Sequence, residues 1–225
     1  MIVFDHAQVD VPHTILGPIS LELAEARIGI IGANGSGKST CARLINGLVS
    51  PTSGTVRVGD LDVASHTKQV RRRVGFVFSD ADNQIIMPTV RDDVAFSLRR
   101  FKLSREEKSA RVSEALNRFG LDTHADDSPH TLSGGQKQLL ALASVLVMRP
   151  EIIVADEPTT LLDARNRLRI KREFSRLEQQ LIVVTHDLDL ISDFDRVIYI
   201  DKGRVVADGL PDEVISTYLE SMTWE

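Results

Sequence analysis

A glycine-rich run that joins an apolar stretch to a helix-patterned stretch constrains this chain more than any other feature. Residues 32–40 read GANGSGKST and fit the phosphate-binding pattern G-x-x-x-x-G-K-[ST], directly after the β-branched run IGII at 28–31. The apolar residues between 41 and 48 then recur at helical spacing. A strand, a glycine loop and a helix in this order predict a loop whose backbone N–H groups, with the helix N-terminus, hold phosphate oxygens.

The chemistry of this loop predicts ATP and Mg²⁺ as its ligands. Lys38 is expected to reach the β and γ phosphates, where it would also serve catalysis, and the Ser39 hydroxyl to bind Mg²⁺. A glycine turn that merely ends a strand would leave a lysine and two hydroxyl residues in register at the helix start unexplained. The candidate nucleotide contacts are Gly32, Ala33, Asn34, Gly35, Ser36, Gly37, Lys38, Ser39 and Thr40.

Polar residues also follow two further apolar runs. Asp156 and Glu157 end the run IIVA, and His186 follows the run IVV at 182–184. Ligands of α/β proteins bind at the carboxyl ends of parallel strands, which favours a site over a surface turn. We expect Asp156 to bind Mg²⁺ and Glu157 to orient or deprotonate the attacking water. His186 is expected to contact the γ phosphate, although a histidine at a strand end is often only a solvated or capping group.

The distribution of apolar runs predicts an α/β fold. Short β-branched runs separated by longer helix-patterned segments are typical of a buried parallel sheet with crossover helices. Residues 1–23 alternate in short pieces instead, which indicates antiparallel strands leaning on that sheet. The five runs predicted as parallel strands lie at 28–31, 74–78, 152–155, 182–184 and 197–200.

Helix signals are clearest in the middle of the chain. Ser104 and Glu107 form a capping-box pattern ahead of apolar residues at helical spacing, which predicts a helix over 104–119. The wider segment 85–130 is expected to be mostly helical. Near the end, DKGRVV is expected to form a hairpin turn, followed by a helix from about Pro211.

Bulk properties set limits on the function. The 225 residues suffice for one large α/β domain, and a formal charge of −5 argues against a broad nucleic-acid-binding surface. The single cysteine cannot form an intrachain disulfide, which fits a reducing cytoplasm. No apolar stretch approaches the length of a membrane span, so work at a membrane would require a partner.

A further motif, LSGGQKQ at 132–138, identifies a family resemblance. Together with GANGSGKS, VADEPTTLLD and VTHD in that order, it closely resembles the ATPase subunits of ABC transporters, over roughly residues 1–210. The resemblance implies an enzyme that hydrolyses ATP. It also implies a P-loop NTPase core with an N-terminal antiparallel β subdomain and an inserted helical subdomain at about 85–145, within one domain spanning 1–225.

The resemblance implies a dimer as well. In that family the LSGGQ of one subunit covers the γ phosphate held by the P-loop of the other, so two ATP molecules lie at a head-to-tail interface. The matching contacts here are Ser133, Gly134, Gly135 and Gln136. Asp163, in TTLLD at 159–163, would contact the opposite subunit. A homodimer is expected because one chain carries the full motif set, but a heterodimer stays open.

Two positions depart from the family pattern. Ser79 stands where a glutamine usually follows the strand, and Gln84 is the nearest substitute as a ligand on the Mg²⁺ side, an assignment left open. The aromatic residue that usually stacks on adenine is also missing, and its stretch offers only Val11 or His13.

Residues 80–96 most resemble the ATPases of energy-coupling-factor importers, which take up vitamins such as biotin or metal ions such as cobalt and nickel. The resemblance implies integral-membrane subunits docked on the 80–100 region, no nucleic-acid partner, and a peripheral place on the cytoplasmic face of the membrane. Apolar contacts there would come from Ile85, Ile86, Met87 and Phe96, unless these only pack internally.

The alternative is a soluble ABC ATPase that remodels nucleic acid or protein complexes. It is disfavoured because the chain has one cassette, no long coiled-coil insertion and no basic arm.

Overall fold

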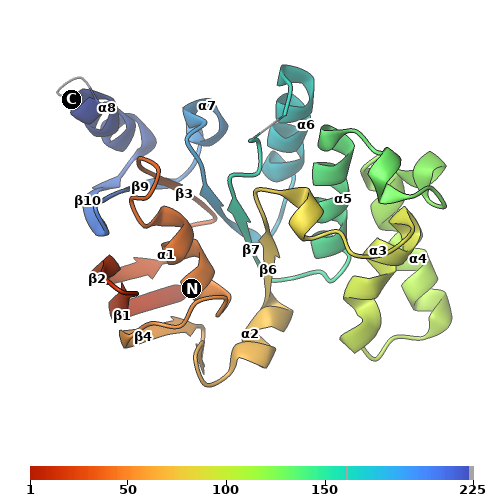
Figure 1. Ribbon diagram of the computed structural model, residues 1–225, viewed down its shortest axis with the longest axis horizontal. Helices are drawn as coiled ribbons and strands as arrows, with labels where there is room; N and C mark the ends of the chain where they lie inside the picture. The colour runs from red at the N-terminus through yellow and green to blue at the C-terminus, as the bar shows by residue number, and fades with distance from the viewer. Residues whose placement is uncertain (161, 223–225) are drawn as a thin grey trace.

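Two β-sheets form the frame of the computed structural model, which describes residues 1–160 and 162–222. The smaller sheet is antiparallel with strand order β2-β1-β4-β5, and the larger has the order β10-β9-β3-β8-β7-β6 (Figure 1). The small sheet contains β1 (Ile2–Asp10), β2 (Thr14–Leu23), β4 (Ser53–Val58) and β5 (Leu61–Asp62). The large sheet contains β3 (Arg27–Ile31), β6 (Val74–Val77), β7 (Ile152–Asp156), β8 (Gln180–Val184), β9 (Arg196–Asp201) and β10 (Arg204–Gly209).

The five β-branched runs predicted as parallel strands all lie in the large sheet, where only β10 pairs antiparallel. Their continuous apolar character follows from burial on both faces. Ile28 and Ile30 of β3 face one core with the small sheet, whereas Ile31 faces the other. The predicted antiparallel strands at the N-terminus are confirmed by the pairing of β1 with β2.

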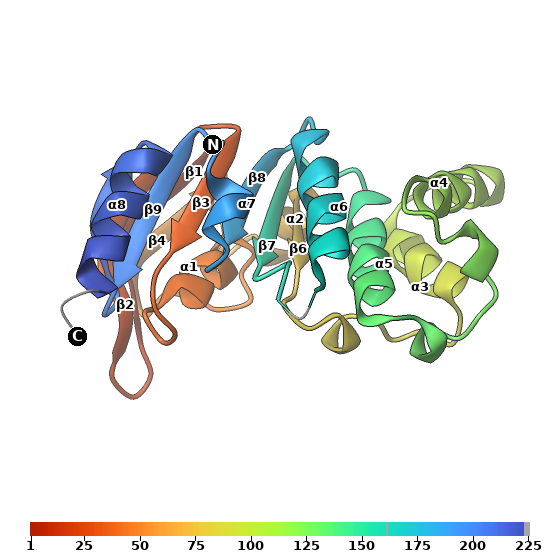
Figure 2. The same cartoon turned by 90° about the horizontal axis from the view of Figure 1, so that it is seen from above.

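Helices cover both faces of the large sheet (Figure 2). The residues of α1 pack in the core beside the small sheet, and those of α3 to α6 pack in the core on the opposite face. The helices are α1 (Lys38–Ile45), α2 (Thr67–Arg73), α3 (Val90–Ser97), α4 (Arg105–Arg118), α5 (Gly134–Leu146), α6 (Ala164–Ser175), α7 (Leu188–Ile191) and α8 (Pro211–Met222). None of the helices in the described ranges is long and apolar enough to cross a membrane.

Local sequence signals explain where the central helices begin. Ser104 and Glu107 exchange both hydrogen bonds of the predicted capping box at the start of α4. Ser133 and Gln136 form a second capping box at the start of α5. The predicted C-terminal hairpin is also present, because β9 and β10 pair across the turn at Gly203.

The register of three parallel strands places the polar residues of interest at one edge. Ile30 of β3 is aligned with Val184 of β8, which is aligned with Asp156 of β7. The backbone N–H of Glu157 then donates to the carbonyl of Val184 at 2.8 Å. The ends of β3, β8 and β7, which lead to the glycine loop, His186 and the acid pair in that order, therefore lie side by side.

Candidate nucleotide-binding site

The glycine loop between β3 and α1 is shaped by close backbone approaches. Gly32 has a φ of 150°, and a Cβ there would lie 2.1 Å from the carbonyl oxygen of Ile200. Gly37 has a φ of 103° and passes close to the carbonyl of Ile15. Both positions therefore require glycine. No described atom lies within 4 Å of a Cβ at Gly35, so the outer edge of the loop is open.

Two buried polar groups face into this loop. Lys38 is only 5% exposed, and its Nζ donates to the carbonyl of Ala33 at 3.0 Å. The Ser36 hydroxyl is buried with no hydrogen-bond partner among the described residues. A buried cation and an unsatisfied hydroxyl beside a helix N-terminus fit phosphate oxygens, because each gains partners when an anion binds. Asn34 and Gly35 form the exposed rim of the loop, and Ala33 and Thr40 complete it.

Oxygen ligands suited to Mg²⁺ meet at the start of α1. The Ser39 hydroxyl donates to Asp156 Oδ1 at 2.8 Å, and the Asp156 carboxylate is 2% exposed. Arg43, one helical turn beyond Ser39, reaches Asp156 Oδ2 at 3.5 Å. In the described part of the chain, no group of three His, Cys, Asp or Glu residues could hold a metal alone. One hydroxyl and one carboxylate fit Mg²⁺ shared with phosphate oxygens and water.

Glu157 occupies the centre of the site. Its φ of 52° is unusual for a residue with a side chain. Glu157 Oε2 lies 2.7 Å from His186 Nδ1 and Oε1 lies 4.0 Å from Lys38 Nζ. The Thr160 hydroxyl donates to Oε2 at 3.4 Å. The carboxylate thus lies between the P-loop lysine and the histidine, where it can accept a proton or orient a water.

The structure places the LSGGQ tip apart from this cluster. In Figures 1 and 2, strands β6 and β7 lie between α1 and α5. Ser133 and Gly134 are exposed, and no described atom comes within 4 Å of a Cβ at Gly134. Gly135 is buried, and a Cβ there would lie 2.3 Å from Asn166 Nδ2. Gln136 completes the capping box and contacts His124 at 3.1 Å.

Asp163 begins α6 as its N-cap. Its Oδ1 accepts from the backbone N–H of Asn166 at 2.8 Å. Its side chain is exposed at the helix start. The preceding TTLLD run contains Leu161, which lies outside the described residues.

The Gln84 side chain has partners other than the Mg²⁺-side groups. Its Oε1 accepts from the N–H of Phe78 at 3.2 Å, and its Nε2 donates to the carbonyl of Ala141 at 2.9 Å. Nε2 thus ties this loop to α5, and Oε1 ties it to the residue after β6. Binding of Gln84 to Mg²⁺ stays a sequence prediction that would require these bonds to be released. Val11 and His13, the residues offered for adenine contact, are exposed in the β1–β2 turn.

Sequence reasoning missed two side chains that hold the acid pair. Arg43 lies four positions after Ser39 on α1, and Thr160 three positions after Glu157. Helical spacing to a candidate ligand was the available signal for Arg43. Thr160 had no comparable signal, because its contact depends on the turn that Glu157 makes.

Comparisons with known proteins identify the family. The family profile described as ABC transporter matches residues 16–160. A Deinococcus radiodurans protein assigned to ABC transporter ATP-binding proteins is 53% identical over 93% of each chain. The biotin transport ATP-binding protein BioM of Rhizobium etli is 49% identical over 91% of each chain. The energy-coupling factor transporter ATP-binding protein EcfA1 of Bacillus licheniformis is 41% identical over 92% of this chain and 76% of its own.

Solved structures agree with these relatives. CbiO1 of Clostridium perfringens, part of the ABC transporter complex CbiONQ, has a TM-score of 0.84 and 31% identity, covering 97% of this chain and 92% of its own. A dimeric ATP-binding cassette, MJ0796, in a post-hydrolysis state with ADP and phosphate has a TM-score of 0.81 and 29% identity, covering 94% and 99%. The chain therefore belongs to the ABC transporter family, as an ATP-binding and ATP-hydrolysing cassette related to those of energy-coupling factor transporters.

Proposed function

We propose that this chain powers a membrane importer of a vitamin such as biotin, or of a metal ion, by hydrolysing ATP in a dimer that encloses two nucleotides. The observation that carries this proposal is the separation of Ser133 and Gly134 from the P-loop of the same chain. Their exposed helix tip has an open approach and a partial positive charge suited to an anion. A second copy placed head to tail would bring that tip over the phosphates held at Lys38.

Each residue of the core site has a proposed role in that dimer. Lys38 and the loop N–H groups bind the phosphates, and Ser39 with Asp156 holds Mg²⁺. Bound Mg²⁺ would neutralise charge that develops on the phosphate oxygens. Glu157 accepts a proton from the attacking water, and His186 holds the Glu157 carboxylate in place through the 2.7 Å contact. Asp163 contacts the opposite subunit from its place at the start of α6.

The loop before α3 is proposed to receive the integral-membrane subunits. Asp93, 4% exposed, accepts hydrogen bonds from the N–H groups of Ile86 and Met87 and from the Ser144 hydroxyl of α5. This buried carboxylate fixes the loop to the helix that begins with the LSGGQ tip. Ile86 is 62% exposed, which leaves an apolar side chain for a partner, whereas Ile85 packs against the core.

The transport role is supported by the relatives named for biotin transport and energy-coupling factor transport. We propose further that residues 1–225 form one cassette on the cytoplasmic face of the membrane, in which the helical part at about 85–145 moves against the core. That motion would carry the effect of hydrolysis at Glu157 to the docked subunits.

Subunit complementation tests the shared site. Lys38→Ala removes the P-loop cation, and Gly134→Asp places a negative charge at the open tip without a clash in its own chain. Each variant alone should be inactive. In a mixed dimer one site combines both lesions and the other has neither, so an equal mixture should recover roughly a quarter of the wild-type ATPase rate. An equal mixture as inactive as the separate variants contradicts a site shared between subunits.

Isolation from membranes tests the transport role. The tagged chain, purified from detergent-solubilised membranes of its native host, should recover a multi-spanning partner, and Ile86→Asp should weaken that recovery. Labelled biotin, cobalt and nickel uptake in cells that carry Lys38→Ala identifies the cargo, because uptake of the true cargo should fail. Recovery of soluble partners only, with normal uptake of all three, would overturn the proposal.

A further inference from the structure

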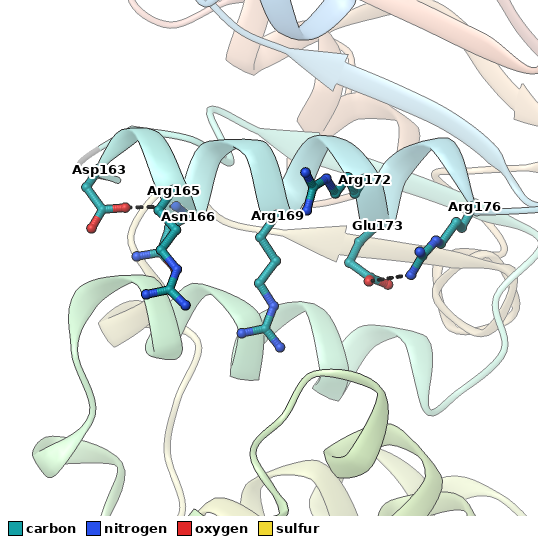
Figure 3. A pocket seen from close by; sticks show the side chains of 7 residues that line it. All are labelled: Asp163, Arg165, Asn166, Arg169, Arg172, Glu173 and Arg176. Carbon is teal, nitrogen blue, oxygen red and sulfur yellow. Dashed lines mark hydrogen bonds and ion pairs between the residues drawn. The ribbon is translucent and has the colours of Figure 1, made fainter.

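A second polar pocket lies along α6. Its residues belong to the side of the large sheet opposite α1, since Ile170 and Phe174 of α6 pack in one core and Cys41 of α1 in the other. The pocket has a volume of about 500 Å³. Four arginines line it, Arg165, Arg169, Arg172 and Arg176, with carboxylates at Asp163 and Glu173 (Figure 3).

The spacing of the four arginines places them on one face of the helix. Positions 165, 169, 172 and 176 follow one another by four, three and four residues, which is the repeat of a single helical stripe. Arg167 and Lys171 of the same helix do not line the pocket. The stripe therefore places the four arginines along one hollow.

The two carboxylates are already occupied by contacts within the chain. Glu173 is 6% exposed and is bonded to Arg118 at 3.0 Å as well as to Arg176 at 3.5 Å. Asp163 caps the N-terminus of α6 through Asn166. Glu173 thus offsets the charge of Arg176, while the start of the helix uses Asp163.

Four arginines against the carboxylates of Asp163 and Glu173 leave the pocket lining with an excess of positive charge. Arg169 donates to the backbone carbonyl of Phe119, which is a neutral acceptor. Arg165 and Arg172 form no ion pair with any carboxylate of the described residues. Three guanidinium groups in one hollow repel one another, so binding of an anion there lowers the electrostatic energy.

The lining also indicates the chemical class of the ligand. Every described residue that lines the pocket is charged or carries an amide, so the lining offers no apolar surface to hold an acyl chain. A guanidinium group can donate two parallel hydrogen bonds to the oxygens of one phosphate. The pocket volume lies within the range of small-ligand sites. We infer that the α6 pocket binds a small polyphosphate anion, of the class of inorganic pyrophosphate, independently of the P-loop.

Calorimetric titration with inorganic pyrophosphate tests this inference. The full chain carries Lys38→Ala and the buffer contains EDTA, so that the P-loop does not contribute. Arg172→Glu should weaken pyrophosphate binding by about tenfold, because a bidentate charge-assisted contact becomes a repulsion. Arg167→Glu is the matched control: it reverses one charge on the same helix outside the pocket and should change the affinity by less than about twofold.

Three results would overturn the inference. The first is a failure of the Lys38→Ala chain to bind pyrophosphate. The second is an equal loss of affinity in Arg172→Glu and Arg167→Glu, which would reflect attraction to a basic helix without a defined site. The third is binding to phosphatidylglycerol vesicles that depends on Arg172 while pyrophosphate does not bind, which would assign the arginines to a membrane surface.

Discussion

The Glu157 carboxylate and the His186 imidazole are joined by a contact of 2.7 Å between Oε2 and Nδ1. A carboxylate oxygen only accepts, so the proton of this bond resides on Nδ1. The histidine thus holds Glu157 at the strand edge and leaves its own Nε2 directed away from the carboxylate. Glu157 and His186 are expected to act as one unit.

Glu157→Gln should retain nucleotide and lower the ATPase rate by a factor of about 100 to 10,000, because an amide cannot accept the proton of the attacking water. The nucleotide-bound dimer should accumulate, since turnover no longer opens it. Steady-state ATPase assays and size-exclusion chromatography with ATP measure both effects. Glu151→Gln, at the opposite end of β7 and exposed, is the control and should be close to wild type. Adding His186→Ala to Glu157→Gln should cost little further activity, and full additivity would argue against the unit.

The orphaned Ser36 hydroxyl predicts opposite effects on stability and on nucleotide binding. Ser36→Ala should raise the free energy of unfolding of the free protein by about 1 kcal/mol, because a buried hydroxyl without a partner is removed. The same change should weaken ATP binding. Urea unfolding with and without nucleotide measures both.

Ser144→Ala is the matched control for Ser36→Ala. Ser144 is equally buried, but its hydroxyl donates to Asp93, so its loss should lower the free energy of unfolding by about 1 to 3 kcal/mol. If Ser36→Ala destabilises the free protein as Ser144→Ala does, the Ser36 hydroxyl has a partner within the chain, and the absence of such a partner is no argument for a phosphate ligand.

The core of the site could be predicted from sequence because it depends on local patterns. A glycine run after β3 and an acid pair after β7 each mark the end of a strand, and the parallel register brings strand ends to one edge. The capping boxes at Ser104 and Ser133 likewise depend on residues three positions apart.

Contacts between distant segments could not be predicted in this way. Gln84 donates to the carbonyl of Ala141, 57 residues along the chain. The sequence of the loop gives no sign that this side chain reaches α5. From the sequence, Asp93 would be predicted as an exposed acid in the first turn of a helix. Its carboxylate is instead buried and accepts a hydrogen bond from Ser144. Helix α2 has only Val70 buried, too little for a periodic signal. Arg71 of this helix donates to the carbonyls of Asn46 and Gly47, which follow α1, and this contact between separate segments has no local signal.

The contact between Gly135 and Asn166 links the LSGGQ helix to α6. Gly135→Ala should lower the free energy of unfolding by about 1 to 3 kcal/mol, because the new Cβ would lie 2.3 Å from the Asn166 amide. Shortening the neighbour in Gly135→Ala/Asn166→Ala should recover most of that loss. Chemical unfolding of the two single variants and the double variant gives the coupling energy.

Gly134→Ala provides the comparison for Gly135→Ala. It adds the same methyl group one position earlier, where no described atom lies within 4 Å, so it should be neutral or slightly stabilising. Equal destabilisation by both changes would assign the loss to the helix start and not to Asn166.

Burial of Cys41 predicts a thiol that is inert in the folded protein and a loss of stability at alkaline pH. The thiol is fully buried, and burial raises its pKa from 9.0 to about 12. Between these values the unfolded chain releases a proton that the folded chain keeps, so stability falls as pH rises through 9. At pH 10 this group should contribute a loss of about 1.4 kcal/mol relative to neutral pH. Comparing urea unfolding of the wild type and Cys41→Ala at pH 8 and pH 10 isolates the cysteine, because all other titrating groups are shared. The thiol should react with a disulfide reagent only after denaturation. Rapid reaction of the native protein, or the same pH dependence in both chains, would show that water reaches Cys41.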